Sequence, residues 1–413
     1  MKKIIAIGTG KIFSLFLDMY DSKKYDLIAI CDNDIKKWGM VIEGYSVFPV
    51  QKLTEIQYDY ICVTCASFKE IKAQIEELGV ETSRIVDFSF LAQYKVIFKN
   101  DKSKDIIKEE YRYFYKEGLP RELKAIERKQ EIQMILSAKT LINDYYGKRI
   151  NDLSEVEFRV FSQNGEDGII QWIVQNVRIN NKCFVEFGVS TYEESNTRFL
   201  LMNNNWSGLI LDGSEKNIEV VKNWDEYWRY DLNARTCFIT KDNINHVIEK
   251  EGFAGEIGLL SVDIDGNDYW VLDAIRCIEP IILICEYNSI FGSEEVVTIP
   301  YDENFYRTDL HYSNLYYGAS LKAFIRWAEK KNYIFLGCNS AGNNAFFVKK
   351  EYFKRELLLK EPKFVMANAR ESRDINGKLS YLNKNQRLNL IKDLPVYNLQ
   401  TEQAMLIKDL YGI

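Results

Sequence analysis

Carboxylates gather at two neighbouring positions in the second half of the 413-residue chain. Asp263 and Asp265 stand two residues apart at the end of one apolar run, and Glu286 ends the next. Side chains two apart on a strand share a face, and parallel strands end at one edge of their sheet. We therefore expect the three carboxylates to meet, although clustered negative charges repel one another.

Two kinds of chemistry fit this cluster. A hard divalent cation such as Mg²⁺ takes oxygen ligands of this type, so Asp263, Asp265 and Glu286 are candidate metal ligands. Alternatively the site is free of metal, and Asp263 or Asp265 is the general base that removes a proton from a substrate hydroxyl.

Further candidates follow Glu286 along the chain. Asn288 is placed to contact a substrate at the same strand end. His311, one of only two histidines, lies in a long segment that should overhang this edge, so it is a third candidate for the base. Tyr312 beside it suits stacking on a sugar or a nucleoside, but aromatic residues that pack on their own loop are an equally good explanation.

Three acidic residues follow the preceding apolar runs in order. Glu186 is followed by Gly188, which lets the backbone pass close to a ligand. Asp212 is placed to accept the hydroxyls of a ribose. Asp242 follows the third run, where an acceptor for the amino group of adenine often lies. Each acid could instead cap the next helix, but the ordered series predicts a nucleotide-binding site.

These residues require a buried parallel sheet to position them. Continuous apolar runs alternate with helical stretches, and they predict strands at residues 183–187, 208–211, 236–240, 258–264 and 281–286. A helix at 320–331 and strands at 333–338 and 345–349 close the sheet. Runs that are continuous rather than alternating indicate a doubly wound α/β sheet with helices on both faces.

A second, smaller Rossmann-like domain is predicted near the N-terminus. Gly8 and Gly10 follow a strand and open a helix, and Asp32 ends the second strand. Phe13 stands where a dinucleotide fingerprint has its third glycine, which counts against NAD binding. A structural or subunit-pairing domain is the favoured interpretation, and the remnant of a nucleotide or nucleotide-sugar site is the alternative.

The predicted organisation has four parts. Residues 1–95 form the Rossmann-like N-terminal domain, 96–150 a helical connector, 151–350 the larger sheet domain, and 351–413 a helical extension.

Composition excludes several classes of protein. The net charge of −6 argues against a nucleic-acid partner. No apolar stretch approaches the roughly 18 residues of a membrane span, and the run that ends at Gly8 is too short for a secretory signal, so a cytoplasmic protein is expected. Cys62 and Cys65 form the one Cys-x-x-Cys pair, and inside an apolar run they indicate buried thiols rather than a zinc site.

Four motifs together resemble the FkbM-type S-adenosylmethionine-dependent methyltransferases. They are Ser-Gln-Asn-Gly-Glu-Asp at 162–167, Val-Glu-Phe-Gly at 185–188, Leu-Asp-Gly at 211–213 and Asp-Ile-Asp-Gly-Asn-Asp at 263–268. Residues 339–348 are similar to the closing hairpin of that family, so the resemblance covers about 158–350. The chain departs from the pattern at Ser261, where many relatives have lysine, and at Ser190, where many methyltransferases have glycine.

The resemblance implies a Rossmann-like methyltransferase sheet, S-adenosylmethionine as cofactor, and O-methylation of a sugar or polyketide hydroxyl. Gln163 and Glu166 would contact the cofactor from the loop before the first strand, Glu186 and Gly188 would line its methionine end, and Asp212 would bind its ribose.

Residues 2–90 contain Cys-Asp-Asn-Asp at 31–34, Trp-Gly at 38–39 and Gly-Tyr-Ser-Val at 44–47. This pattern resembles the domains fused to bacterial sugar-modifying enzymes, which implies a nucleotide-linked sugar of capsule or lipopolysaccharide synthesis as the substrate. Arg370 and Arg373 would clamp its diphosphate in bidentate fashion, with surface ion pairs as the alternative. A homo-oligomer is expected.

Two other functions remain open at this point. One is an NAD-dependent nucleotide-sugar oxidoreductase or epimerase that uses the N-terminal domain. The other is a non-catalytic assembly protein of the same pathway.

Overall fold

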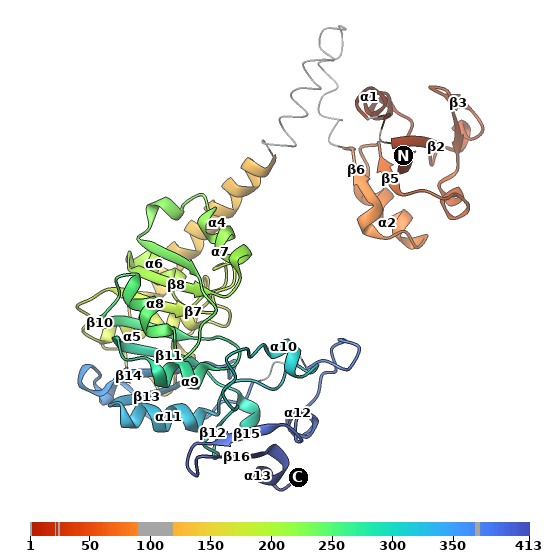
Figure 1. Ribbon diagram of the computed structural model, residues 1–413. Helices are drawn as coiled ribbons and strands as arrows, with labels where there is room; N and C mark the ends of the chain where they lie inside the picture. The colour runs from red at the N-terminus through yellow and green to blue at the C-terminus, as the bar shows by residue number, and fades with distance from the viewer. Residues whose placement is uncertain (1, 21, 24, 90–118, 368–371) are drawn as a thin grey trace. The chain divides into compact units, whose positions relative to one another are not determined.

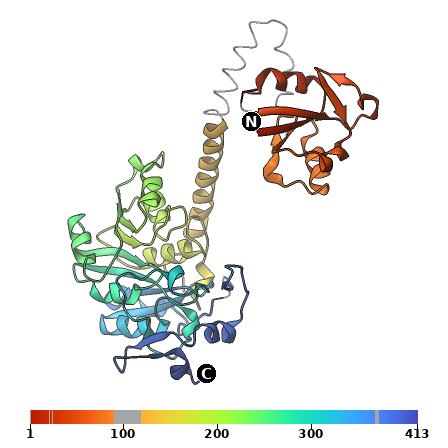
Figure 2. The ribbon, with the colours of Figure 1, turned by 45° about the vertical axis from the view of Figure 1, so that its right-hand side comes forward.

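The computed structural model describes residues 2–20, 22–23, 25–89, 119–367 and 372–413 (Figures 1 and 2). The chain divides into two compact units, Met1–Glu127 and Arg128–Ile413, which we call the N-terminal and C-terminal units. Within the described ranges, no helix has both the length and the apolar character that crossing a membrane requires.

The N-terminal unit is a small Rossmann-like sheet, as predicted. Its strands have the order β3-β4-β2-β1-β5-β6, and all neighbours are parallel except β3 and β4. The strands are β1 (Lys2–Ile7), β2 (Tyr25–Cys31), β3 (Val41–Ile42), β4 (Tyr45–Phe48), β5 (Tyr60–Val63) and β6 (Ile85–Asp87). Helix α1 (Lys11–Met19) packs on one face through Phe13 and Phe16, and α2 (Phe68–Glu77) packs on the other through Ile71 and Ile75.

Helix α4 (Leu119–Ile142) forms the described part of the predicted connector, and residues 96–118 lie outside the described ranges. Figure 2 shows α4 as one long helix. Its last turns pack Ala138 and Ile142 against Phe161 and Phe199 of the C-terminal unit. Glu131 adds an ion pair with Arg198 at 2.9 Å.

The C-terminal unit contains the predicted doubly wound sheet. Its seven strands have the order β13-β14-β11-β10-β7-β8-β9, in which β14 is antiparallel to both neighbours and the other pairs are parallel. The strands are β7 (Cys183–Phe187), β8 (Ser207–Asp212), β9 (Leu232–Thr236), β10 (Gly255–Val262), β11 (Ile278–Glu286), β13 (Tyr333–Cys338) and β14 (Asn344–Lys349). The central strands are buried and mostly apolar because both of their faces are covered.

Three helices cover each face of this sheet. One apolar cluster joins it to α5 (Glu166–Asn176), α6 (Arg198–Asn204) and α7 (Glu215–Lys222). A second cluster joins the opposite face to α8 (Ile244–Lys250), α9 (Asp268–Ala274) and α11 (Leu321–Lys330). Helix α11 illustrates the pattern, because Leu321, Phe324 and Trp327 recur at helical spacing and are buried.

Two elements differ from the sequence prediction. The third strand was expected at residues 236–240, but β9 occupies Leu232–Thr236. Strand β9 lies at the edge of the sheet and is half exposed, so it lacks the continuous apolar run that marks the central strands. The prediction of this strand was therefore wrong.

The C-terminal extension was expected to be helical throughout. It contains α12 (Lys384–Leu390) and α13 (Ile407–Tyr411), but also β15 (Pro395–Asn398) and β16 (Gln403–Leu406). These strands form an antiparallel sheet with β12 (Val297–Thr298). Val396 and Ile407 are buried in a cluster with Phe291, so the extension packs on the segment that follows β11.

Candidate active site

A cavity of about 700 Å³ lies at the carboxyl ends of the central strands. Ligands of open α/β sheets bind at this edge. The lining comes from the ends of β7, β8 and β10, from the turn after β9, and from the segment around α10 (Arg307–Leu310). It includes Gly188, Ser190, Asp212, Gly213, Asn217, Phe238, Ile239, Asp263, Asp265, Asn267, Phe305, Tyr306, Arg307, Thr308 and Asn314.

Gly188, at the end of β7, lies against the ends of β8 and β10 at the cavity wall. Its backbone is left-handed, with φ +72°, and a Cβ atom there would lie 1.6 Å from the carbonyl oxygen of Asp263. Its N–H donates to the carbonyl of Leu211 at 2.9 Å. The sequence analysis expected Gly188 to let a ligand pass close to the backbone. In the structure the glycine is needed because β7 and β10 lie too close together for a side chain.

Asp212 is held at the cavity wall with acceptor capacity to spare. Its Oδ2 accepts from the backbone N–H of Ser190 at 2.7 Å, and its Oδ1 accepts from the N–H of Ser214 at 2.8 Å and from Nδ2 of Asn217 at 3.1 Å. A carboxylate offers about four acceptor positions. Asp212 therefore keeps an acceptor position that the chain's own donors do not use.

Ser190 takes a strained conformation that serves this arrangement. Its φ is +49°, a left-handed value that glycine tolerates better than serine does. This turn directs the Ser190 N–H at Asp212. Ser190, where many methyltransferases have glycine, therefore still adopts the left-handed backbone conformation of a glycine.

The predicted carboxylate cluster is present in the structure. One oxygen each of Asp263, Asp265 and Glu286 lie within 4.8 Å of one another. Burial raises the pKa of Asp263 well above its usual value, and the charges of Asp265 and Asp268 raise it further. Burial and the charge of Asp263 likewise raise the pKa of Glu286. Oε2 of Glu286 is buried and finds no hydrogen-bond donor among the residues that the structure describes.

Arg307 joins this cluster and was missed by the sequence analysis. Its Nη1 donates to Asp265, its Nε donates to the carbonyl of Asn314 at 2.9 Å, and its guanidinium lies 3.8 Å from the ring centre of Tyr317. Burial opposes its charge, but Tyr317, Asp265 and Glu286 raise its pKa. A signal existed, because Arg307 is the only lysine or arginine between Asn288 and Tyr317.

The cluster does not fit Mg²⁺ in this arrangement. Three carboxylates are suitable oxygen ligands, but Asp265 is paired with a guanidinium that already supplies positive charge. One of the three metal ligands proposed from the sequence, Asp265, is therefore already bound to Arg307.

Two of the other predicted cofactor acids, Glu186 and Glu166, bind loops of the chain itself. Glu186 is buried and accepts from Ser195 Oγ at 2.6 Å and from the backbone N–H groups of Asn196 and Thr197 at 2.9 and 3.1 Å. Glu166 is also buried, and its donors are the N–H of Asn164 and the side-chain amides of Asn339 and Asn344, at 2.7 to 2.9 Å. Neither carboxylate lines the cavity.

Gln163 and Asp242 are exposed and also lie outside the cavity lining. Asp242 was expected there because it was placed at the end of the third strand. Since β9 ends at Thr236, six residues earlier, the turn brings Phe238 and Ile239 to the cavity instead.

The predicted acceptor-side residues are engaged elsewhere. His311 Nδ1 lies 2.6 Å from Ser313 Oγ, burial lowers its pKa, and its ring stacks on Tyr312 at 4.4 Å. Neither ring lines the cavity. Asn288 donates from Nδ2 to the carbonyls of Leu315 and Tyr317, both at 3.0 Å, so it fixes the segment that carries Tyr317.

Of the two arginines expected to bind a diphosphate, the structure describes only Arg373. Arg373 donates to the carbonyl of Gly377 at 3.2 Å, within its own turn. Arg370 lies outside the described residues.

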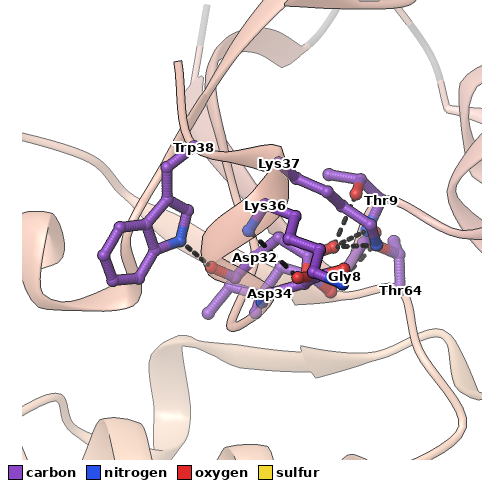
Figure 3. A network of polar contacts seen from close by, with 9 residues as sticks. Gly8, Thr9, Asp32, Asp34, Lys36, Lys37, Trp38 and Thr64 are labelled. Atoms are coloured by element: carbon purple, nitrogen blue, oxygen red, sulfur yellow. Dashed lines mark hydrogen bonds and ion pairs between the residues drawn. The ribbon is translucent and has the colours of Figure 1, made fainter. Parts of the chain in front are cut away.

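The N-terminal unit contains its own polar network around Asp32 (Figure 3). The carboxylate accepts from the N–H and Oγ1 of Thr9 at 2.9 and 2.5 Å, from the N–H of Asp34 at 2.9 Å and from Lys37 Nζ at 2.9 Å. Burial opposes ionisation, but these hydrogen bonds lower the pKa of Asp32 to about 2. Asp32, which would bind a ribose in a dinucleotide site, thus accepts hydrogen bonds from the chain itself.

The crevice beside this network is also filled. Thr64 Oγ1 donates to the carbonyl of Gly8 at 2.6 Å. A Cβ atom on Gly8 would lie 2.7 Å from Cβ of Cys65, so β1 and β5 meet closely at the point where the strand order reverses. These contacts support the structural interpretation of the domain.

Comparison with known proteins gives limited matches. Residues 1–86 match the family model described as C2185-like, N-terminal. A search of curated proteins gives no match.

Solved structures that are similar to this chain include methyltransferases. The methyltransferase FkbM from Methylobacillus flagellatus KT is 13% identical, with 69% of this chain and 79% of that chain covered and a TM-score of 0.20. A putative caffeoyl-CoA O-methyltransferase from Staphylococcus aureus is 13% identical, with 45% and 82% covered and a TM-score of 0.30. TrmK of M. capricolum, in complex with S-adenosylhomocysteine, is 12% identical, with 45% and 70% covered and a TM-score of 0.28. At these scores the Rossmann-like assignment rests on the strand order of the chain itself.

Proposed function

We propose that the C-terminal unit is an S-adenosylmethionine-dependent O-methyltransferase that acts on the hydroxyl of a nucleotide-linked sugar in bacterial surface-polysaccharide synthesis. The observation that carries the proposal is Asp212, a strand-end carboxylate with spare acceptor capacity, in one cavity with Asp263. A volume of about 700 Å³ suits a cofactor together with part of an acceptor.

The cofactor half of the cavity comes from the first three strands. Asp212 would accept the ribose hydroxyls, and the turn from Gly188 to Ser190 would line the methionine portion. Phe238 and Ile239 supply apolar surface suited to an adenine ring. When bound, S-adenosylmethionine supplies an electrophilic methyl group on a sulfonium centre.

Asp263 is the group best placed to take the acceptor proton. It lines the cavity, and burial raises its pKa above the ordinary value, which makes its carboxylate a stronger base. S-adenosylmethionine would supply its methyl group to the acceptor oxygen and leave as S-adenosylhomocysteine, and Asp263 would take the hydroxyl proton. Asp265 is less suited because it pairs with Arg307, and His311 because it bonds to Ser313.

The acceptor half of the cavity suits a carbohydrate. Tyr306 lines it with a side chain that is 59% exposed, and Asn267 and Asn314 lie in the same wall. An exposed ring beside polar side chains can stack on a sugar face. The nucleotide link and the pathway rest on the resemblance of the N-terminal domain to those of sugar-modifying enzymes.

The test is mass spectrometry of candidate nucleotide-sugars incubated with the full chain and S-adenosylmethionine. We expect a gain of one methyl group, and its loss in Asp263→Asn with cofactor binding retained. No methylated product from any nucleotide-sugar, or equal turnover by Asp263→Asn, would contradict the proposal. Excess chelator should leave turnover unchanged, because the proposed transfer uses no Mg²⁺.

A further inference from the structure

The acidic edge contains a largely buried cation, Arg307, that the proposed methyl transfer does not itself use. The side chain of Arg307 is only 16% exposed, whereas its partner Asp265 is 58% exposed. An arginine stays charged when it is buried, so its charge must be offset by its surroundings.

The surroundings of Arg307 fix it from two sides. The carbonyl of Asn314 accepts from Nε at 2.9 Å, and the ring of Tyr317 lies beneath the guanidinium at 3.8 Å. Asn288 in turn holds the backbone carbonyl of Tyr317 at 3.0 Å. These contacts hold the guanidinium at the acidic edge, where Nη1 donates to Asp265.

The edge itself requires positive charge. Asp263, Asp265 and Glu286 bring three carboxyl groups within 4.8 Å, and Oε2 of the buried Glu286 has no donor among the described residues. Such a cluster is stable only with a cation or with bound protons. Arg307 is the positively charged side chain that the described part of the chain places in contact with it.

We propose that Arg307 is the resident cation of this edge, a positioning residue that takes the place of a divalent ion among Asp263, Asp265 and Glu286. The native chain then binds divalent cations weakly at this edge, and removal of the guanidinium converts the edge into a divalent-cation site. This inference deepens the proposed function by assigning the acceptor side of that cavity a guanidinium instead of a metal.

The test measures the binding of Mn²⁺, followed by electron paramagnetic resonance of the free ion, to the chelator-treated full chain without substrate. Arg307→Met removes the charge at similar length, and Arg307→Lys keeps a charge. We expect Arg307→Met to bind Mn²⁺ at least about tenfold more tightly than the native chain, because a nearby positive charge is gone. Arg307→Lys should stay close to the native chain, and adding Asp265→Asn to Arg307→Met should abolish the gain.

Tight binding of Mn²⁺ to the native chain that Asp265→Asn removes would overturn the proposal. So would a folded Arg307→Met variant, checked by circular dichroism, that gains no affinity. If Arg307→Met does not fold, the native chain and Arg307→Gln carry the same comparison. None of these readouts needs S-adenosylmethionine, so a failure of the proposed function would appear separately, as absent cofactor binding.

Discussion

Gly188 shows how a single residue sets the geometry of the cavity. Replacing it with alanine puts a methyl group against the carbonyl of Asp263 and keeps an unfavourable left-handed backbone. Overpacking and the left-handed conformation together predict a loss of about 3 kcal/mol in the free energy of unfolding. Urea denaturation of the full chain measures this loss.

Gly213→Ala is the matched control, since Gly213 lines the same cavity. The nearest atom to a Cβ there is in the ring of Phe238, at 3.5 Å, which is ordinary contact. Its loss should stay below about 1 kcal/mol. Equal losses for the two variants would show that the close approach of β7 to β10 does not govern stability here.

At the residue scale, the sequence predicts which acids lie at strand ends better than it predicts whether each acid faces the cavity or a neighbouring loop. Asp263, Asp265 and Glu286 were expected to meet at one edge and lie within 4.8 Å of one another, because a buried strand and its end form a local pattern. Glu186 was expected to face the cofactor but bonds to Ser195, Asn196 and Thr197. Which way a buried acid turns depends on donors from another loop, and no local pattern encodes them.

Asp32 and its donors act as a clamp that holds the first turn of the N-terminal sheet to the end of β2. Asp32→Asn removes the charge that Thr9, Asp34 and Lys37 stabilise. We expect faster hydrogen exchange, followed by mass spectrometry of the full chain, in peptides from residues 2–38. Asp34→Asn is the control, because the carboxylate of Asp34 is exposed and accepts from the N–H of Lys36.

The pH dependence of this clamp has a definite sign. The pKa of Asp32 is about 2 in the folded chain, below the ordinary 3.8, so the ionised form stabilises the fold. The difference in protection between the native chain and Asp32→Asn should be constant above about pH 4 and shrink as the pH falls toward 2. A difference that grows on acidification, or an equal effect of Asp34→Asn, would contradict the clamp.

At the element scale, buried strands were predictable and edge strands were not. The runs for β7, β10 and β11 are apolar because helices cover both of their faces. Strand β9, at the edge, reads Leu-Asn-Ala-Arg-Thr and gives no such signal. Strands β15 and β16 pair with each other, and β15 pairs with β12 about a hundred residues earlier in the sequence, so no local pattern shows this partner.

At the scale of the whole molecule, each unit has its own sheet and its own apolar clusters. Both units have the Gly-turn and strand-end acid of a nucleotide site, yet they use the acid differently. Asp32 accepts four hydrogen bonds from donors of the chain. Asp212 accepts three, and it lines a cavity. This contrast favours the proposed cofactor site in the C-terminal unit over the NAD-dependent alternative.

Isothermal titration calorimetry of the full chain with S-adenosylhomocysteine tests this account most directly. The account predicts one binding site per chain and an affinity at least about tenfold lower in Asp212→Asn, since a hydrogen bond to a charged group is lost. Asp32→Asn should bind like the native chain. Absence of binding to the native chain, or an unchanged affinity in Asp212→Asn, would contradict the assignment of this cavity to S-adenosylmethionine.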